Sequence, residues 1–188
     1  MKKILYVEKT ARAYQAEDIP KVNSLLQTTK SLVLEAIKSD FKVEQGSDFG
    51  EWAIRRLEKG FHGLVTHFPY DRSFCNNPDF FKLKGEAFFS EMYRSSVRVM
   101  KEIRRRFPNL AVVVYTGAST EGGDGDSSNS PIHKVISNAG ANRIIYRSND
   151  LITDAREVHR CLFELISKEA TPITSTTPAS SQLFLQYP

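Results

Sequence analysis

Short apolar runs rich in strand-forming residues recur along the chain. The continuous runs are Lys3–Glu8, Phe61–Phe68, Ala111–Tyr115 and Arg143–Tyr146. Runs that are apolar without alternation are typical of strands covered on both faces, as in a parallel sheet. Phe41–Gln45 alternates apolar and polar residues, which indicates an edge or half-exposed strand. The pattern therefore predicts five strands.

Apolar residues recur at helical spacing in the stretches around these runs, and each stripe can cover one face of a sheet. The stripe residues are Val22, Leu25, Leu26, Val33, Ala36 and Ile37; Trp52, Ala53 and Leu57; Phe89, Met92, Tyr93, Val99, Met100 and Ile103; and Val158, Leu162, Leu165 and Ile166. A shorter helix is predicted over Pro131–Ser137, because Ser130 can cap it and proline suits its first turn. Asn138-Ala139-Gly140 would end that helix.

Strict alternation of strands and helices predicts the fold class. Right-handed crossovers and short connections give an α/β fold, a doubly wound three-layer sandwich around a five-stranded parallel sheet. Such folds bind ligands beyond the carboxyl ends of the strands. Three connections on that edge are longer than usual, namely Lys9–Pro20, Pro69–Leu83 and Ser119–Ser130. We therefore expect the function to reside at this edge.

The length of 188 residues, 40% of them hydrophobic, fits one domain and a tail. We assign residues 1–169 to the domain and 170–188 to a Ser/Thr/Pro-rich C-terminal tail. The two cysteines, Cys75 and Cys161, are too few for a disulfide framework and suit a reducing compartment. The apolar runs are far shorter than a membrane span, and no apolar leader follows Met1. We expect a cytoplasmic location and no membrane partner.

The net charge of +4 is too small to indicate nucleic-acid binding by itself. A basic stripe follows one predicted helix, with Glu91 and Glu102 offering little compensation. The stripe consists of Arg94, Arg98, Lys101, Arg104, Arg105 and Arg106. No aromatic residues for base stacking are interleaved with it, so we interpret it as a solvated face and do not expect a nucleic-acid partner.

Motifs of nucleotide-binding and hydrolytic enzymes are missing. Neither G-x-G-x-x-G after the first strand nor G-x-x-x-x-G-K-[ST] occurs, and Gly117-Ala118-Ser119 only begins a nucleophile elbow. Asp124, Asp126 and Ser128 have the initial spacing of a calcium loop, but its glycine and its bidentate acid are replaced by Asn129 and Val135. We therefore predict no enzymatic activity, no metal site and no cofactor.

Polar residues stand at the ends of four predicted strands. KILYVEK ends in Glu8 and Lys9, FHGLVTH in His67, VVVYTGAS contains Thr116, and RIIYRS contains Arg147. In these residues and in the order of its elements, the chain resembles the receiver domains of two-component response regulators. The resemblance extends over roughly residues 3–168 and implies a flavodoxin-like, receiver-like fold.

The resemblance also implies which chemistry is altered. A typical receiver has paired acids for Mg²⁺ at the first strand end, where Lys9 replaces one acid and Glu8 remains. It has a phospho-accepting aspartate at the third strand end, where His67 stands. Thr116 corresponds to the switch Ser or Thr, and Arg147 to a lysine, whose compact ammonium group a guanidinium does not reproduce. The resemblance therefore implies a receiver-like fold that lacks the phospho-accepting aspartate, as in an atypical pseudo-receiver.

Two functions follow from this interpretation. The first is a phosphorylation-independent signalling or regulatory domain that binds a partner protein, which could be another chain or a second copy in a homodimer. The resemblance implies a partner face near Tyr146, Arg147 and Arg156. The alternative is a sensor or enzyme for a small molecule or anion, using a crevice at the strand ends. That crevice would be lined by Glu8, Thr66, His67, Thr116 and Arg147.

Overall fold

The computed structural model describes residues 1–7, 19–46, 49–68, 85–116 and 131–168. Its centre is one sheet of parallel strands in the order β2-β1-β3-β4-β5. The strands are β1 (Lys3–Val7), β2 (Lys42–Gly46), β3 (Gly63–Thr66), β4 (Ala111–Thr116) and β5 (Arg143–Tyr146). This order is the flavodoxin-like arrangement, in which the chain leaves β1 toward one edge and returns to its other side at β3. The predicted fold class is confirmed.

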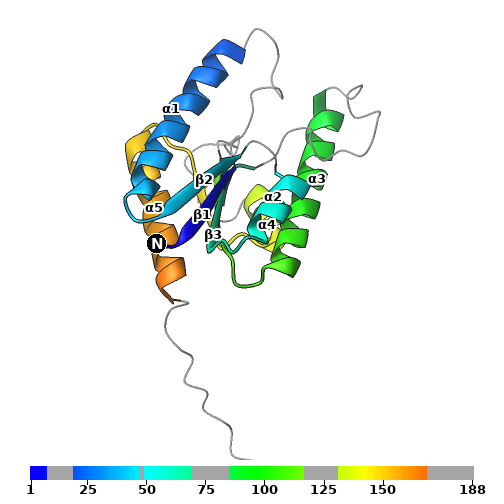
Figure 1. Cartoon of the computed structure of the whole chain (residues 1–188). Helices are drawn as coiled ribbons and strands as arrows, with labels where there is room; N and C mark the ends of the chain where they lie inside the picture. The colour runs from blue at the N-terminus through cyan, green and yellow to red at the C-terminus, as the bar shows by residue number, and fades with distance from the viewer. Residues whose placement is uncertain (8–18, 47–48, 69–84, 117–130, 169–188) are drawn as a thin grey trace, which may run out of the picture.

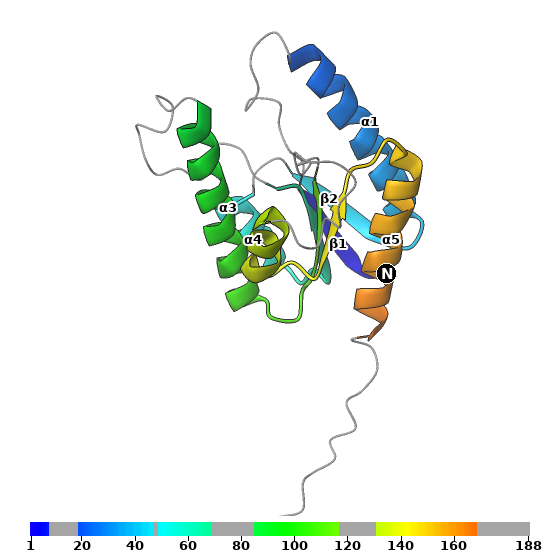
Figure 2. The same cartoon turned by 180° about the vertical axis from the view of Figure 1, so that it is seen from behind.

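Helices cover both faces of the sheet and complete three layers (Figures 1 and 2). The first and last of them, α1 (Ile19–Lys38) and α5 (Leu151–Lys168), lie side by side on one face. The other face is covered by α2 (Glu51–Leu57), α3 (Gly85–Arg106) and α4 (Pro131–Ala139). No helix in the described ranges is both long and apolar enough to span a membrane.

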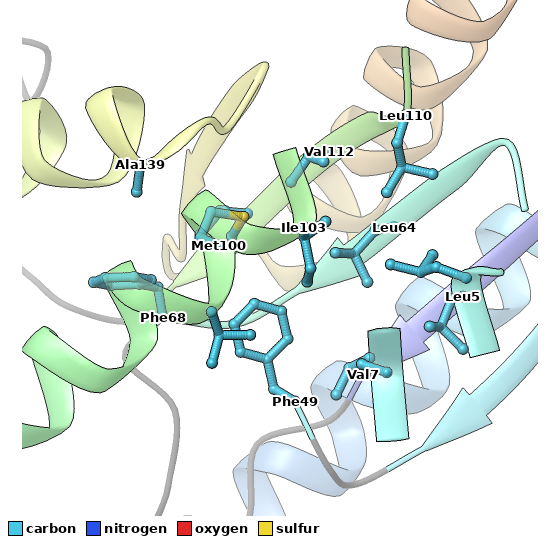
Figure 3. Packing of buried hydrophobic residues seen from close by; sticks show 14 of the residues in the cluster. Leu5, Val7, Phe49, Leu64, Phe68, Met100, Ile103, Leu110, Val112 and Ala139 are labelled. Atoms are coloured by element: carbon cyan, nitrogen blue, oxygen red, sulfur yellow. The ribbon is translucent and has the colours of Figure 1, made fainter. Parts of the chain in front are cut away.

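One hydrophobic cluster fills the space between the sheet and helices α2, α3 and α4. Leu64 and Val112 point from the central strands toward Met100 and Ile103 of α3, as Figure 3 shows. Phe49 precedes α2 and is fully buried in the same cluster. Alternating residues of β1 and β4, together with Leu64 of β3, therefore belong to this layer, as a sheet covered on both faces requires.

A second cluster lies on the opposite face, between the sheet and helices α1 and α5. Its strand residues include Ile4, Val65 and Val113, which are fully buried. Gly63 allows α5 to approach closely, because a Cβ there would lie 2.8 Å from Ile4 Cδ1 and 3.1 Å from Leu162 Cδ2. Two tyrosines, Tyr6 and Tyr115, also belong to this layer, and their hydroxyl groups lead to the candidate site.

The element boundaries differ from the predicted ones at a few ends. Helix α1 begins at Ile19, so Pro20 lies in its first turn instead of ending the preceding connection. Phe41 precedes β2, because its N–H donates to the Ile37 carbonyl and continues the helical turn. The third strand is limited to Gly63–Thr66, half the predicted length. Gly140 ends α4 with a φ of +117°, as glycine after a helix commonly does.

Several predicted features lie outside the described residues. They are Glu8 and Lys9, the greater part of each of the three long connections, Cys75, and the proposed tail at 170–188.

Candidate functional site at the carboxyl edge of the sheet

Strand register places the predicted site residues next to one another. Thr66 is opposite Val7 on one side and Val114 on the other, and Thr116 is opposite Tyr146. The ends of β3, β4 and β5 therefore meet at one edge, as expected for parallel strands. His67 and Arg147 follow directly after two of these strands.

Two threonines at this edge are buried rather than open to solvent. Thr66 is 0% exposed and Thr116 is 1% exposed. The Thr116 hydroxyl donates to the Phe68 carbonyl at 2.5 Å, and the Thr116 carbonyl accepts from the Arg147 N–H at 2.8 Å. The hydroxyl at the predicted switch position is therefore engaged in joining the ends of β3 and β4.

His67 is also buried, with 6% of its surface exposed. Its Nε2 lies 3.1 Å from the Tyr6 hydroxyl, and the two rings meet edge to face at 6.1 Å between centroids. The Tyr115 ring lies 5.7 Å away on the same layer. His67 is thus a hydrogen-bonded residue within an aromatic layer beneath the edge.

A buried carboxylate next to this layer was missed by the sequence analysis. Asp154 of α5 is 6% exposed, and it accepts three hydrogen bonds. The Tyr115 hydroxyl donates to Oδ2 at 2.9 Å, the Ser148 N–H donates to Oδ2 at 2.8 Å, and the Ser148 hydroxyl donates to Oδ1 at 2.8 Å. Asp154 therefore fixes the segment between β5 and α5 to the end of β4.

A signal for Asp154 was present in the sequence. It stands four residues before Val158 and eight before Leu162, and so lies on the apolar stripe of its helix. An acid on a buried stripe needs hydrogen-bond donors, which indicates a structural network. Of the two residues that donate to it, Ser148 is only six positions away, whereas Tyr115 is 39 positions away and could only be assigned from the fold.

The electrostatics of the edge follow from this network. Burial raises the pKa of Tyr115 above its ordinary value, and the hydrogen bond to Asp154 and the charge of that carboxylate raise it further. The positive charge of Arg147 acts in the opposite direction on the same pKa, which places its guanidinium within electrostatic reach of the Tyr115 hydroxyl. Tyr115 therefore stays protonated at neutral pH and serves as a donor.

The predicted partner face has an aromatic part and a charged part. Tyr146 is half-buried, and its ring stacks on His133 of α4 at 6.1 Å between centroids. Arg156 is exposed on α5. Near it, the pKa of Asp150 is lowered chiefly by hydrogen bonds from Thr153, with a smaller contribution from the Arg156 charge.

The structure thus brings Thr66, His67, Thr116 and Arg147 to one edge, whereas Glu8 and Lys9 lie outside the described residues. Among the residues that are described, no cluster of three His, Cys, Asp or Glu side chains could hold a metal ion.

Part of the basic stripe serves the fold itself. Glu102 accepts hydrogen bonds from both Arg105 and Arg106. Arg104 donates to the carbonyls of Pro108, Leu110 and Gly140 and to the Asn142 side chain. Glu102 therefore compensates more of the positive charge of the stripe than expected from the sequence. Arg94, Arg98 and Lys101 are exposed.

Comparison with solved structures identifies the class of fold. The chain superposes on a response regulator receiver domain protein (CheY-like) from Methanospirillum hungatei JF-1 with a TM-score of 0.52 and 15% identity, covering 89% of this chain and 98% of the other. A response regulator from Thermotoga maritima gives 0.52 and 14%, covering 89% and 98%. A response regulator receiver domain protein from Clostridium thermocellum gives 0.50 and 17%, covering 90% and 97%.

These similarities define the fold as that of CheY-like receiver domains. No protein-family model matches the chain, and no curated protein does. At identities of 14 to 17%, the similarity concerns the backbone arrangement, and the function has to be argued from this chain's own side chains.

Proposed function

We propose that this chain is a receiver-like signalling or regulatory domain that acts by binding a partner protein, without phosphorylation. The observation that carries the proposal is the end of β3. The segment Gly63–Phe68 contains no carboxylate, and His67 is buried with Nε2 at 3.1 Å from the Tyr6 hydroxyl. An acyl phosphate forms on a carboxylate nucleophile, and Mg²⁺ beside it requires several oxygen ligands.

The hydrogen bonds at the carboxyl edge of the sheet support a fixed arrangement of its side chains. A phosphorylation switch needs a hydroxyl that can change partner, but the Thr116 hydroxyl donates to the Phe68 carbonyl. Asp154 holds the β5–α5 connection through Tyr115 and Ser148. A domain with this edge would present a constant surface to its partner.

The partner face that we propose lies around Tyr146, Arg147 and Arg156. The exposed Arg156 and the half-buried Arg147 supply cationic groups that suit an acidic partner surface. The alternative of a ligand crevice at the strand ends has less support, because Thr66, His67 and Thr116 are buried side chains. Those three groups would have to move before they could contact a ligand.

A direct test of phosphorylation independence is incubation of the full chain with acetyl phosphate and Mg²⁺, followed by intact-mass measurement. We expect no added phosphoryl group, while a conventional receiver domain treated in parallel gains one. A hydroxylamine-labile gain of one phosphoryl group on this chain would overturn the proposal. In that case Asp71 would be the first residue to examine as the acceptor.

Partner binding needs a separate test. The full chain is used as bait in an extract of its native cell, alongside Arg156→Glu and a control, Lys101→Glu, which places the same charge change on an exposed site of α3, across the sheet from α5. We expect a reproducibly retained protein that Arg156→Glu loses and Lys101→Glu keeps. The same protein retained equally by both variants would place the interface elsewhere.

A further inference from the structure

A pocket lies at the opposite edge of the sheet, where the strands begin. It is formed by the first residues of β1 and β2 and by the turn between α2 and β3. The lining residues are Lys3, Lys42, Val43, Glu44, Lys59 and Phe61. None of them belongs to the carboxyl edge, so this pocket is independent of the site described above.

The fold holds the three lysines around one pocket. Lys3 and Lys42 are in-register neighbours on adjacent parallel strands, so their side chains leave the same face of the sheet. The Lys3 ammonium donates to the Lys59 carbonyl at 3.2 Å, which ties the turn to the start of β1. The same ammonium lies 5.8 Å from the centroid of the Phe61 ring. Phe61 is itself packed against the core and forms a firm apolar wall.

The charge of the pocket is not compensated within the described residues. Glu44 is the acid that lines it, and its carboxylate forms an ion pair with Arg56 of α2. No carboxylate in the described part of the chain lies within ion-pair distance of the Lys3, Lys42 or Lys59 ammonium groups. Three like charges around one pocket repel one another, and a bound anion would relieve that repulsion.

We propose that this pocket binds a small phosphate-bearing anion, with its oxygens contacting the Lys3, Lys42 and Lys59 ammonium groups. Lysine is a common phosphate ligand that acts as a point charge, and three such charges suit a group with more than one negative charge. The same chemistry is offered by inorganic pyrophosphate and by the diphosphate of a nucleotide. The apolar wall of Phe61 distinguishes them, because only a nucleotide has a ring that can lie against it.

The probe for the test is inorganic pyrophosphate, titrated without Mg²⁺ into the ¹⁵N-labelled full chain at low ionic strength. We expect saturable shifts of the amide signals of Lys3, Lys42–Glu44 and Lys59–Phe61. Lys42→Glu and Lys59→Glu should each weaken binding at least about tenfold, because reversal turns an attraction at contact distance into a repulsion. The matched control is Lys134→Glu, with affinity expected within about twofold of the wild type because α4 is remote from the pocket.

Folding and self-association are checked on the same samples. Lys42 and Lys59 are exposed, so the variants should melt as the wild type does. A lysine on an edge strand also discourages pairing with another sheet, so size-exclusion chromatography must show that Lys42→Glu is monomeric like the wild type. Lys42→Gln, which removes the charge without reversing it, should weaken pyrophosphate binding less than Lys42→Glu does.

ADP is the second probe. If ADP binds more tightly than pyrophosphate and Phe61→Leu removes the difference, the ligand is of the nucleotide class; equal affinities assign an inorganic anion.

The proposal is overturned if pyrophosphate and ADP both give no saturable shifts at millimolar concentration. It is also overturned if Lys42→Glu and Lys59→Glu bind as the wild type does, or if Lys134→Glu weakens binding equally. These outcomes do not depend on phosphorylation or on the partner protein.

Discussion

Asp154 illustrates what a buried charge requires at the scale of one residue. A carboxylate taken out of water costs several kcal/mol unless hydrogen-bond donors replace the solvent. Here three donors from Tyr115 and Ser148 do so, and two of them bind the same oxygen. The consequence is a rigid junction between β4, the start of α5 and the segment between β5 and α5.

Removing one donor tests that junction. Tyr115→Phe keeps the ring in place and deletes the hydroxyl, so the unfolding free energy should fall by about 1.5 to 3 kcal/mol, as for a buried hydrogen bond to a charged group. Urea denaturation at pH 7 measures the loss, and Ser148→Ala should destabilise in the same direction. A Tyr115→Phe protein as stable as the wild type would show that this hydrogen bond contributes nothing.

Tyr115 also makes the unfolding free energy depend on pH. Because the pKa of Tyr115 is raised above 10.0 in the folded state, the folded protein holds that proton more tightly than the unfolded chain. The stabilisation is complete below pH 10 and is lost as the pH rises further. Between pH 10 and 11 the wild type should therefore lose stability more steeply than Tyr115→Phe.

Cys161 should be an unreactive thiol. Burial raises its pKa to about 11 from 9.0, and Glu157 adds to the effect. A rise from 9.0 to about 11 leaves roughly a hundredfold less thiolate at a given pH. In a Cys75→Ser background at pH 8, a thiol reagent such as dithiobis(nitrobenzoate) should label the native protein at least that much more slowly than the urea-unfolded protein. Equal rates would contradict the burial of Cys161.

The sequence was informative about residues whose environment is set locally and uninformative about the others. The burial of Val113 could be predicted from the uninterrupted apolar run around it, because such a run fits a strand whose two faces are both covered by helices. His67 could be placed at a strand end, but its contact with Tyr6 joins residues 61 positions apart. Contacts of that kind depend on the order of the strands in the sheet, and a local sequence pattern does not predict that order.

At the scale of elements, β2 and α2 are joined by the only tryptophan in the chain. A Cβ on Gly46 would lie 2.0 Å from Trp52 Cη2, so the indole occupies the space that glycine leaves. The Arg56 guanidinium lies 5.7 Å from the centre of the same ring and also pairs with Glu44 of β2. The short helix α2 is thereby held on the edge strand.

Gly46→Ala should disturb this contact. The added methyl group cannot coexist with the present ring position, and overpacking of this kind costs about 1 to 3 kcal/mol. We expect a lower midpoint of urea unfolding and a shift of Trp52 fluorescence to longer wavelength, as the ring becomes more exposed. Gln45→Ala, an exposed neighbour on the same strand, is the control and should change neither. An unchanged emission spectrum in Gly46→Ala would contradict the close approach.

Strand β4 offers a stricter test of the sheet. All six of its residues, Ala111–Thr116, are buried, so Val113→Asp would place an unpaired carboxylate in a dry interior. Several kcal/mol should be lost, enough to unfold a domain of ordinary stability. Circular dichroism and thermal melting report the result, with Val135→Asp on the exposed face of α4 as the control. A Val113→Asp protein that melts cooperatively near the wild-type temperature would refute the assignment of β4.

Element types were more predictable than element ends. The edge position of β2 followed from its alternating pattern, and the structure gives it mixed burial at the sheet edge. The end of α1 was harder, because Phe41 is apolar enough for a strand and yet completes a helical turn while its ring enters the core. Tertiary packing overrides local pattern at such junctions.

At the scale of the whole molecule, carboxylates at or near the surface in several parts of the chain share one property. Hydrogen bonds from Arg105 and then Arg106 lower the pKa of Glu102 from 4.5 to about 2. The pKa of Asp40 is lowered by Ser39 and then by His159, and that of Glu51 by Arg55. In each case the folded state releases the proton more readily than the unfolded chain.

These shifts predict the acid side of the stability curve. The stabilisation is present above the ordinary pKa values of 3.8 to 4.5 and is lost as the pH falls toward the folded values. The unfolding free energy should therefore decline from about pH 5 to pH 2. Urea melts across that range should show a shallower decline for Glu102→Gln, and also for the wild type in 1 M NaCl, which screens exposed pairs. A decline independent of both changes would exclude these ion pairs as its cause.

The contact between the first and last helices has a consequence for how the protein is made. Helix α5 packs against α1 and reaches Gly63 of β3 through Leu162, so elements from both ends of the described chain complete one face of the sheet. During synthesis, the strand residues of that face are covered only in part, by α1, until α5 has left the ribosome. A nascent chain halted before Leu151 would carry a bare apolar surface and be a target for chaperones. The core of the domain is thus completed only once α5 is available, and no portion of the described chain that lacks α5 has a finished core.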